Sequence, residues 1–205
     1  MWSAAILAGG RARRLGGRDK AALQVGPSAI LERQLALLRS LVDRILIVAN
    51  DDTRYAQYGV PVVHDRVEGA GALGGLYTAI DAAATPRVLV LACDLPFLTR
   101  DFLSRLMTEG RDVDVVLPRT RDGFHPLCAA YSDRAGVEFG VQLARGVRKI
   151  TDAIEGSAGL TVRELNPDEL MAYDPHFTLF FNVNTPDDYA RAIELGAEVE
   201  DDHDA

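Results

Sequence analysis

Three short, uninterrupted apolar runs constrain the fold of this chain more than any other feature of its sequence. They span residues 4–7, 45–49 and 88–93 and consist of Ala, Val, Ile, Leu and one Cys. A strand with one face in water alternates apolar and polar residues, so uninterrupted runs are typical of strands covered on both faces. In parallel sheets, the helices that connect the strands pack on both faces of the sheet and bury them. The runs therefore predict an α/β fold.

Helical patterns lie between these runs. Ser28 can cap a helix whose apolar positions recur at spacings of four, three and four: Leu31, Leu35, Leu38 and Val42. We expect further helices at 73–84, after a cap at Thr99, at 135–144, and from Thr185, where Pro186 takes the first helical position. We expect later strands at 113–117, 126–131 and 179–183.

Composition and charge indicate a single globular domain. With 205 residues, 48% of them hydrophobic, the chain can bury one core, and its net charge of −8 argues against a general binder of nucleic acid or anionic membranes. We expect one domain over 1–195 and a disordered acidic tail over 196–205, where these residues gather: Glu198, Glu200, Asp201, Asp202 and Asp204.

The cysteines and the length of the apolar runs indicate the cellular location of the protein. Cys93 and Cys128 form no CxxC pair and each lies in an apolar stretch, which is typical of reduced thiols in the cytoplasm. No stretch approaches the roughly 20 apolar residues of a membrane span. We therefore expect a cytoplasmic protein with no membrane partner.

The segment LAGGRARRLGGRDK, residues 7–20, follows the first apolar run and combines four glycines with five cations. It fits neither the phosphate-binding loop GxxxxGK with a following Ser or Thr nor GxGxxG. Glycines still allow backbone N–H groups to approach an anion, and Arg or Lys can neutralise a polyphosphate. A nucleoside triphosphate is the ligand this favours; a flexible, charged surface loop is the alternative.

Polar side chains also follow the predicted strands, at the edge where ligands bind in α/β sheets. Asn50 and Asp65 end two short runs, and Asp94 follows LVLAC directly, where a carboxylate can hold Mg²⁺ or serve as a turn residue. Asn182 and Asn184 in FFNVNTPDDY would share one side of a strand, although such a pair also serves caps. In GFHPLCAAY, His125 could contact substrate or be structural.

Taken together, these motifs resemble the nucleotidyltransferases of the molybdenum cofactor guanylyltransferase type. LAGGRARRLGGRDK is similar to the signature loop of that family, ACDLP to its metal-binding strand end, GFHPLCAAY to its substrate-side segment and FFNVNTPDDYARA to its C-terminal motif. The resemblance implies a Rossmann-like nucleotidyltransferase fold with three α/β/α layers and a mainly parallel, partly mixed sheet.

The resemblance also implies a reaction, in which GTP and molybdenum-molybdopterin give molybdopterin guanine dinucleotide and pyrophosphate. By position it assigns nucleotide contacts to these residues: Leu7, Ala8, Gly9, Gly10, Lys20, Asn50, Asp65 and Asp94. Asp94 becomes the Mg²⁺ ligand and Asn184 assists the metal or the pterin phosphate, while Lys20 and Arg14 balance the triphosphate charge. His125, Asn182 and Asn184 become substrate contacts, and molybdoenzyme-specific chaperones or apo-molybdoenzymes become candidate partners.

Three alternatives to this reaction stay open. A cytidylyltransferase acting on the same pterin, or a nucleotidyltransferase with another phosphorylated acceptor, would carry the same residue types. A binding or delivery protein for GTP or finished cofactor would also retain them without turnover. Pyrophosphate release separates the enzymes from the binding protein, and nucleotide preference separates the enzymes from one another.

Overall fold

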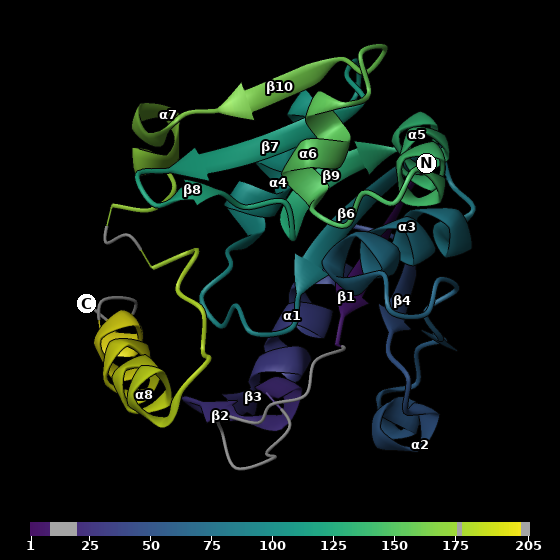
Figure 1. Cartoon of the computed structure of the whole chain (residues 1–205). Coiled ribbons are helices and arrows are strands. Elements are labelled where there is room, and N and C mark those ends of the chain that lie inside the picture. The colour runs from purple at the N-terminus through teal and green to yellow at the C-terminus, as the bar shows by residue number, and fades with distance from the viewer. Residues whose placement is uncertain (9–19, 176–177, 202–205) are drawn as a thin grey trace.

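The computed structural model describes residues 1–8, 20–175 and 178–201, the last five of them as backbone. Its centre is an eight-stranded sheet in the order β10-β7-β9-β6-β1-β4-β5, with β8 paired to β7 (Figure 1). The strands are β1 (Trp2–Leu7), β4 (Arg44–Val48), β5 (Val62–Val63), β6 (Arg87–Ala92), β7 (Val115–Thr120), β8 (Gly123–Phe124), β9 (Cys128–Ser132) and β10 (Val162–Leu165).

The sheet is mainly parallel. β1 lies between β4 and β6 and runs parallel to both, so that Ile6 is level with Ile47 on one side and with Leu91 on the other. β5 continues this parallel order beyond β4, and β10 pairs in parallel with β7. β9 runs antiparallel to its neighbours β6 and β7. The prediction of a mainly parallel, partly mixed sheet is confirmed, and the carboxyl ends of β1, β4, β5 and β6 meet at one edge.

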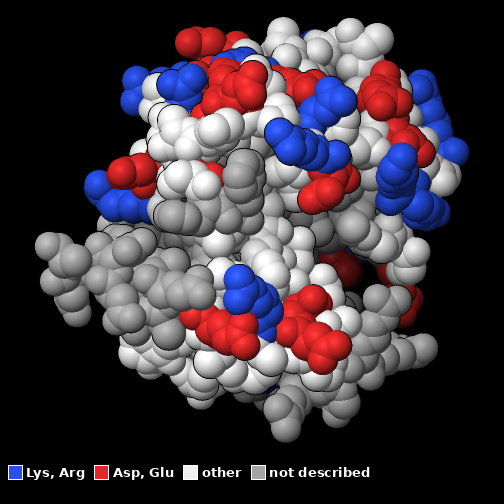
Figure 2. Space-filling model, turned by 90° about the vertical axis from the view of Figure 1, so that its left-hand side faces the viewer, with Lys and Arg blue, Asp and Glu red and all other residues white. Residues whose placement is uncertain are grey.

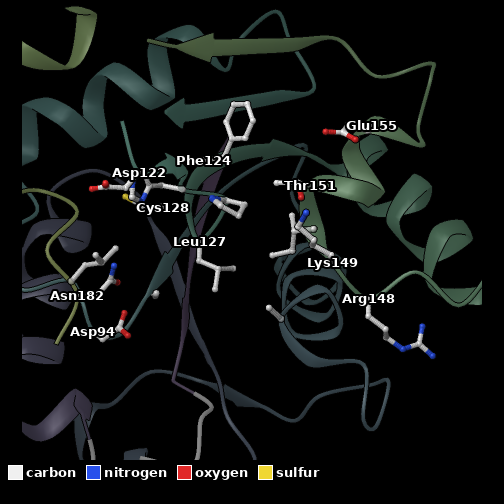
Figure 3. A pocket seen from close by; sticks show the side chains of 17 residues that line it. Asp94, Asp122, Phe124, Leu127, Cys128, Arg148, Lys149, Thr151, Glu155 and Asn182 are labelled. Carbon is white, nitrogen blue, oxygen red and sulfur yellow. The ribbon is translucent and has the colours of Figure 1, made fainter. Parts of the chain in front are cut away.

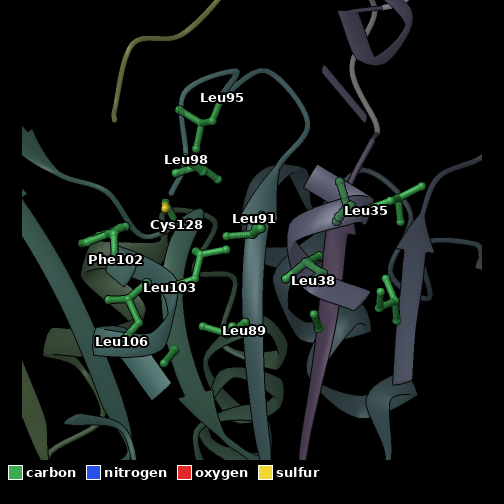
Figure 4. Close-up of a cluster of buried hydrophobic side chains, with 14 of the residues drawn as sticks. Leu35, Leu38, Leu89, Leu91, Leu95, Leu98, Phe102, Leu103, Leu106 and Cys128 are labelled. Atoms are coloured by element: carbon green, nitrogen blue, oxygen red, sulfur yellow. The ribbon is translucent and has the colours of Figure 1, made fainter. Parts of the chain in front are cut away.

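Helices cover both faces of the sheet (Figure 1). One face packs against α1 (Ile30–Arg39) and α4 (Arg100–Glu109), and the other against α3 (Gly71–Ala83), α5 (Asp133–Ala144) and α6 (Ile150–Glu155). Figure 4 shows Leu89 and Leu91 of β6 between the side chains of α1 and those of α4. The predicted three layers, helices on either side of a sheet, are therefore confirmed.

The two-sided cover explains the uninterrupted apolar runs. Along β1, Ala4 and Ile6 belong to the core under α1, whereas Ala5 belongs to the core under α3. In β6, Leu89 and Leu91 likewise face one core, and Val88 and Val90 face the other. Since successive residues of a strand point to opposite faces, every position of the runs 4–7 and 88–92 is apolar.

Smaller elements complete the chain. They are η2 (Lys20–Ala22), β2 (Gln24–Val25), β3 (Ser28–Ala29), α2 (Asp52–Tyr55), η3 (Ala56–Tyr58), α7 (Pro167–Met171) and α8 (Pro186–Asp201). β2 and β3 form a separate antiparallel hairpin. A third apolar cluster joins this hairpin to α8 and to the segment after β6: Leu23, Val25, Ile30, Phe97, Val183 and Ala192. The C-terminal helix is thereby held beside the segment that follows η2.

Two local predictions are wrong. The residues 179–183 form turns and loop rather than a strand. Leu179 and Val183 are apolar because they fill two different cores. Ser28 lies in β3 and does not cap α1, whose N-cap is Ala29; there the Glu32 carboxylate accepts a hydrogen bond from the Ala29 N–H at 2.9 Å. The caps predicted at Thr99 and Thr185 are confirmed by hydrogen bonds from Phe102 N–H and Asp188 N–H.

The C-terminal helix includes residues for which the sequence predicts a disordered acidic tail. α8 runs from Pro186 to Asp201, so 196–201 are helical, and 202–205 lie outside the described residues. Within the part of the chain that the structure describes, no helix combines the length and apolarity that crossing a membrane requires.

Candidate active site

Three polar side chains from distant parts of the sequence meet at the carboxyl edge of the sheet. The Lys20 ammonium, on η2, lies 3.1 Å from Oδ2 of Asp94, which follows β6. The same ammonium donates a short hydrogen bond to Oδ1 of Asn184, just before α8. The exposed fractions of the Lys20 and Asp94 side chains are only 22% and 17%, so their charges are partly shielded from water. We call these three residues the polar triad.

Backbone hydrogen bonds fix the turn that carries Asp94. The Cys93 N–H donates to the Leu7 carbonyl of β1 at 3.2 Å, and the Val183 N–H donates to the Asp94 carbonyl at 3.0 Å. The carboxylate oxygen Oδ1 of Asp94 is buried and accepts no hydrogen bond from the residues that the structure describes. A buried oxygen without a partner is unfavourable unless a ligand completes it, so Oδ1 is suited to a cation.

The start of α8 fixes Asn184. Oδ2 of Asp188 accepts hydrogen bonds from the backbone N–H groups of Asn184 and Thr185 at 2.9 and 2.8 Å. Burial acts to raise the pKa of Asp188, but these donors, the Thr185 hydroxyl and the nearby Lys20 charge outweigh it and lower the pKa. Asp188 therefore remains an anion that holds the Asn184 backbone in place.

The predicted nucleotide contacts lie at the ends of β1, β4 and β5. The Ala8 N–H donates to the Val48 carbonyl at 2.9 Å, and the Tyr55 hydroxyl donates to the Ala8 carbonyl at 3.0 Å. Oδ1 of Asn50 accepts from the Asp65 N–H at 3.1 Å. Oδ1 of Asp65 is buried and has no hydrogen-bond partner within the described ranges. Burial raises the pKa of this carboxyl, although its hydrogen bond with Asn50 opposes the shift.

Of these contacts, Leu7 is the last residue of β1 and is half-buried. Gly9, Gly10 and Arg14 lie outside the described residues.

A cavity of about 910 Å³ opens beside Asp94. Figure 3 shows Asp94 and Asn182 on one side of it, and Arg148, Lys149 and Thr151 on the other. Arg148 and Lys149 were not predicted as site residues; their signal in the sequence is a pair of adjacent cations in the loop between α5 and α6. Further lining residues are Ala72, Ala92, Leu95, Asp122, Gly123, Phe124, His125, Pro126, Leu127, Cys128, Ile150 and Glu155.

His125 lies in the wall of this cavity. Its ring stacks on Phe180 with ring centroids 4.0 Å apart, and Nε2 is 2.8 Å from the Thr120 hydroxyl. Burial lowers the pKa of His125, although the nearby Asp122 opposes the shift, so the imidazole is neutral near pH 7. His125 also lines a second cavity of about 600 Å³, bounded by α7 and Phe181.

The two asparagines do not act as one pair in the structure. Asn184 contacts Lys20, whereas Asn182 is exposed, lines the large cavity and donates through Nδ2 to the Phe180 carbonyl at 3.1 Å. The prediction that Asn182 and Asn184 share one side of a strand depended on a strand at 179–183. The structure has a loop there, and it separates the two amides.

Acidic and basic side chains are mixed on the face shown in Figure 2. This view is from the left-hand side of Figure 1, and the two kinds of charge are interspersed over the described part of the face.

Among all the residues that the structure describes, no three His, Cys, Asp or Glu side chains form a cluster that could hold a metal ion. A metal at Asp94 would therefore need amide, water or substrate oxygens as its other ligands.

A mainly parallel sheet between two helical layers, with Lys20 and Asp94 converging at its carboxyl edge, is the arrangement of a nucleotidyltransferase of Rossmann-like fold. The chain belongs to the family of the MobA-like NTP transferase domain, whose model matches residues 4–158.

Curated relatives cover nearly the whole chain. A probable molybdenum cofactor guanylyltransferase of Pelotomaculum thermopropionicum is 33% identical over 91% of this chain and 89% of its own. A molybdenum cofactor guanylyltransferase of Mesorhizobium japonicum is 33% identical over 93% of both chains. Among solved structures, the molybdopterin-guanine dinucleotide biosynthesis protein A of Archaeoglobus fulgidus is similar, with a TM-score of 0.80, 27% identity and coverage of 96% of this chain and 99% of that one.

Proposed function

We propose that this protein transfers GMP from GTP to the phosphate of molybdenum-molybdopterin, forming molybdopterin guanine dinucleotide and pyrophosphate. The observation that carries the proposal is the convergence of Lys20, Asp94 and Asn184 beside a cavity of about 910 Å³. The choice of guanine and pterin is supported by the named activity of relatives that match over nine tenths of the chain.

The transfer needs no nucleophilic side chain. A phosphate oxygen of the pterin attacks the α-phosphorus of GTP, and the bond from that phosphorus to the bridging β-phosphate oxygen breaks, so that pyrophosphate leaves with the bonding electrons. A phosphate monoester has its second pKa near 6, so the attacking oxygen is already largely deprotonated at neutral pH. Positioning and charge stabilisation are then the tasks left to the protein.

The residues present fit a magnesium ion at Asp94. Oδ1 of Asp94 is buried and has no partner among the described residues, and Lys20 contacts both this carboxylate and the amide of Asn184. One or two carboxylates, several waters and the phosphates of a nucleotide are the usual Mg²⁺ environment. When bound, Mg²⁺ would supply positive charge that neutralises the phosphates and the pyrophosphate leaving group.

The protein's own cations divide between the two substrates. Lys20, together with Arg14 and the amides of Gly9 and Gly10, serves the triphosphate, and the carboxyl ends of β4 and β5 present Asn50 and Asp65 to the nucleoside. Across the cavity, Lys149 and Arg148 serve the anionic pterin substrate. His125 and Asn182 line the same cavity and are proposed acceptor contacts.

Location and protein partners follow from this chemistry. Cys93 and Cys128 are both thiols, and burial raises the pKa of the Cys128 thiol. Buried thiols support a cytoplasmic location, where the cofactor would be handed to molybdoenzyme-specific chaperones or to apo-molybdoenzymes.

Pyrophosphate release tests the proposal. We expect Mg²⁺-dependent release with GTP and molybdenum-molybdopterin together, and none when either is omitted. Release with CTP instead identifies a cytidylyltransferase, and release with GTP and a different phosphorylated acceptor identifies another nucleotidyltransferase. GTP binding without release under any condition contradicts an enzymatic role and favours a binding or delivery protein.

A further inference from the structure

Gln34 is a buried polar residue that the proposed mechanism does not use. It lies on α1, and its exposed fraction is 1%. Its side-chain nitrogen Nε2 donates two hydrogen bonds, to the Ala92 carbonyl at 2.8 Å and to the Leu95 carbonyl at 3.0 Å. Cys93 and Asp94 lie between these two carbonyls, so one side chain of α1 holds both ends of the turn that carries Asp94.

Gln34 is a polar residue in an apolar environment. Its neighbours on the buried face of α1 are Leu31, Leu35 and Leu38, which pack in the main core. Among the residues that the structure describes, the buried carbonyl oxygen Oε1 of Gln34 has no hydrogen-bond partner. Burying an unpaired polar atom is unfavourable, so the two hydrogen bonds of Nε2 must offset that cost.

The same turn is anchored from three directions. Cys93 N–H donates to Leu7 of β1, Asp94 accepts from the Val183 N–H of the segment before α8, and Gln34 holds the turn from α1. The first two anchors are backbone groups that any sequence would supply. Gln34 provides a side-chain anchor from the helix that packs behind the sheet, next to η2 and Lys20.

We propose that Gln34 is a positioning residue for the transfer reaction, whose side-chain amide holds the turn 92–95 so that the Asp94 carboxylate faces Lys20 and the cavity. The inference rests on the proposed function, because it assigns Asp94 the metal and phosphate chemistry. Gln34 itself is too deeply buried to touch a substrate, and it does not line the cavity. Small displacements of a catalytic group are costly for rate, since catalysis depends on pre-set geometry.

The decisive variant is Gln34→Met, which keeps length and volume and removes the donor. We expect Tm to fall only slightly, because the Ala92 and Leu95 carbonyls lose their donor while the unpaired Oε1 disappears. We also expect kcat to fall about tenfold and the affinity for Mn²⁺ in the presence of GTP, measured by electron paramagnetic resonance, to weaken severalfold. Gln34→Asn retains the amide donor on a side chain that is one methylene shorter, so it should lie between the native protein and Gln34→Met.

Thr85→Val is the matched control. The Thr85 hydroxyl is also buried, and it bridges the Ser3 hydroxyl at 3.0 Å and the Arg87 carbonyl at 3.1 Å at the opposite edge of the sheet. Its loss should lower Tm and leave kcat and Mn²⁺ affinity unchanged. Both variants should thus lower Tm, but only Gln34→Met should lower kcat and Mn²⁺ affinity.

The outcomes separate the inference from the proposed function. Native kcat and native Mn²⁺ affinity in Gln34→Met overturn the positioning role, and so does a loss of activity that only follows a lowered Tm. If Gln34→Met does not fold, native Mn²⁺ affinity in Gln34→Leu, which also lacks the donor, overturns it instead. If the native protein releases no pyrophosphate, the proposed function fails, while Mn²⁺ affinity and the hydrogen exchange of the turn amides still decide whether Gln34 holds Asp94.

Discussion

Lys20 is the residue on which the electrostatics of the site depend. Its ammonium joins Asp94, after β6, to Asn184, before α8, and without a ligand it neutralises the Asp94 carboxylate. A nucleoside triphosphate would compete for the Lys20 ammonium, and a divalent cation would compete for the Asp94 carboxylate. We therefore expect the Lys20–Asp94 contact to be replaced by contacts with these ligands. Lys20 and Asp94 could both be predicted from the sequence. Asp94 directly follows an apolar run, and Lys20 closes a glycine-rich segment.

Removing the carboxylate of Asp94 should abolish turnover without unfolding the protein. In Asp94→Ala the Mg²⁺ ligand is lost and Lys20 is left without its anion, so we expect kcat to fall by at least about 10³-fold. The measurement is steady-state pyrophosphate release, with circular dichroism to verify folding. Asp43→Ala, at an exposed aspartate before β4 and at the opposite end of that strand from Asn50, should behave as the native protein. Near-native kcat in Asp94→Ala would remove Asp94 from the metal role.

Lys20 should matter chiefly for GTP. Lys20→Ala removes the positive charge beside the triphosphate, and we expect kcat/KM for GTP to fall by about 10²-fold or more. Lys20→Arg keeps the charge but replaces a compact ammonium by a planar guanidinium, so an intermediate value is expected. An unchanged kcat/KM in Lys20→Ala would mean that Lys20 is a structural partner of Asp94 and Asn184 only.

At the scale of elements, the sequence predicted the strands that are buried on both faces of the sheet. It did not predict segments whose conformation depends on tertiary contacts. The strands β1, β4 and β6 were predicted to within two residues because two-sided burial leaves an apolar run. The segment 179–183 carries an equally apolar pattern, yet its residues fill separate cores from a loop. Gln34 resembles any polar residue of a helix in sequence, because its role arises only once α1 packs behind β6.

Asp114 joins three elements and should contribute strongly to stability. Its carboxylate accepts hydrogen bonds from the Ser132 hydroxyl at 2.8 Å, from the Thr161 N–H at 2.9 Å and from Arg134 at 3.2 Å. Burial acts to raise its pKa, but the Thr161 and Ser132 hydrogen bonds and the Arg134 charge outweigh it, so that the pKa is lowered. We expect Asp114→Ala to lower the free energy of unfolding by about 3 kcal/mol in urea titrations.

The pH dependence of this contribution has a defined sign. Because the pKa of Asp114 is lower in the folded than in the unfolded chain, its ionisation stabilises the fold above the unfolded value and the stabilisation is lost as pH falls through the folded value. The difference in unfolding free energy between the native protein and Asp114→Ala should therefore shrink on acidification below about pH 4. The exposed neighbour Asp112, changed to Ala, should show neither effect, and a constant difference down to pH 2 would contradict the argument.

At the scale of the whole molecule, segments that are far apart in the sequence meet around one cavity. The first half brings Asp94 at the end of β6, and the second half brings Lys149 and Arg148 between α5 and α6. The antiparallel strand β9 makes this possible, because it reverses the direction of the chain and starts α5 from the far edge of the sheet. A sequence read from local patterns contains no sign that the loop 145–149 returns to face Asp94.

This division predicts that the two substrates can be separated by mutation. Lys149 lines the cavity, and its ion pair with Asp152 at 3.1 Å is exposed on both sides, so Lys149→Ala should cost little stability. We expect KM for molybdenum-molybdopterin to rise about tenfold, while the Kd for GTP, measured by titration calorimetry, stays unchanged. Arg145→Ala, at an exposed cation of the same loop that does not line the cavity, should alter neither constant. If Lys149→Ala weakens GTP and leaves the pterin unaffected, the two walls serve the substrates in the opposite order, and the acceptor must then bind on the side of Lys20 and the glycine-rich segment.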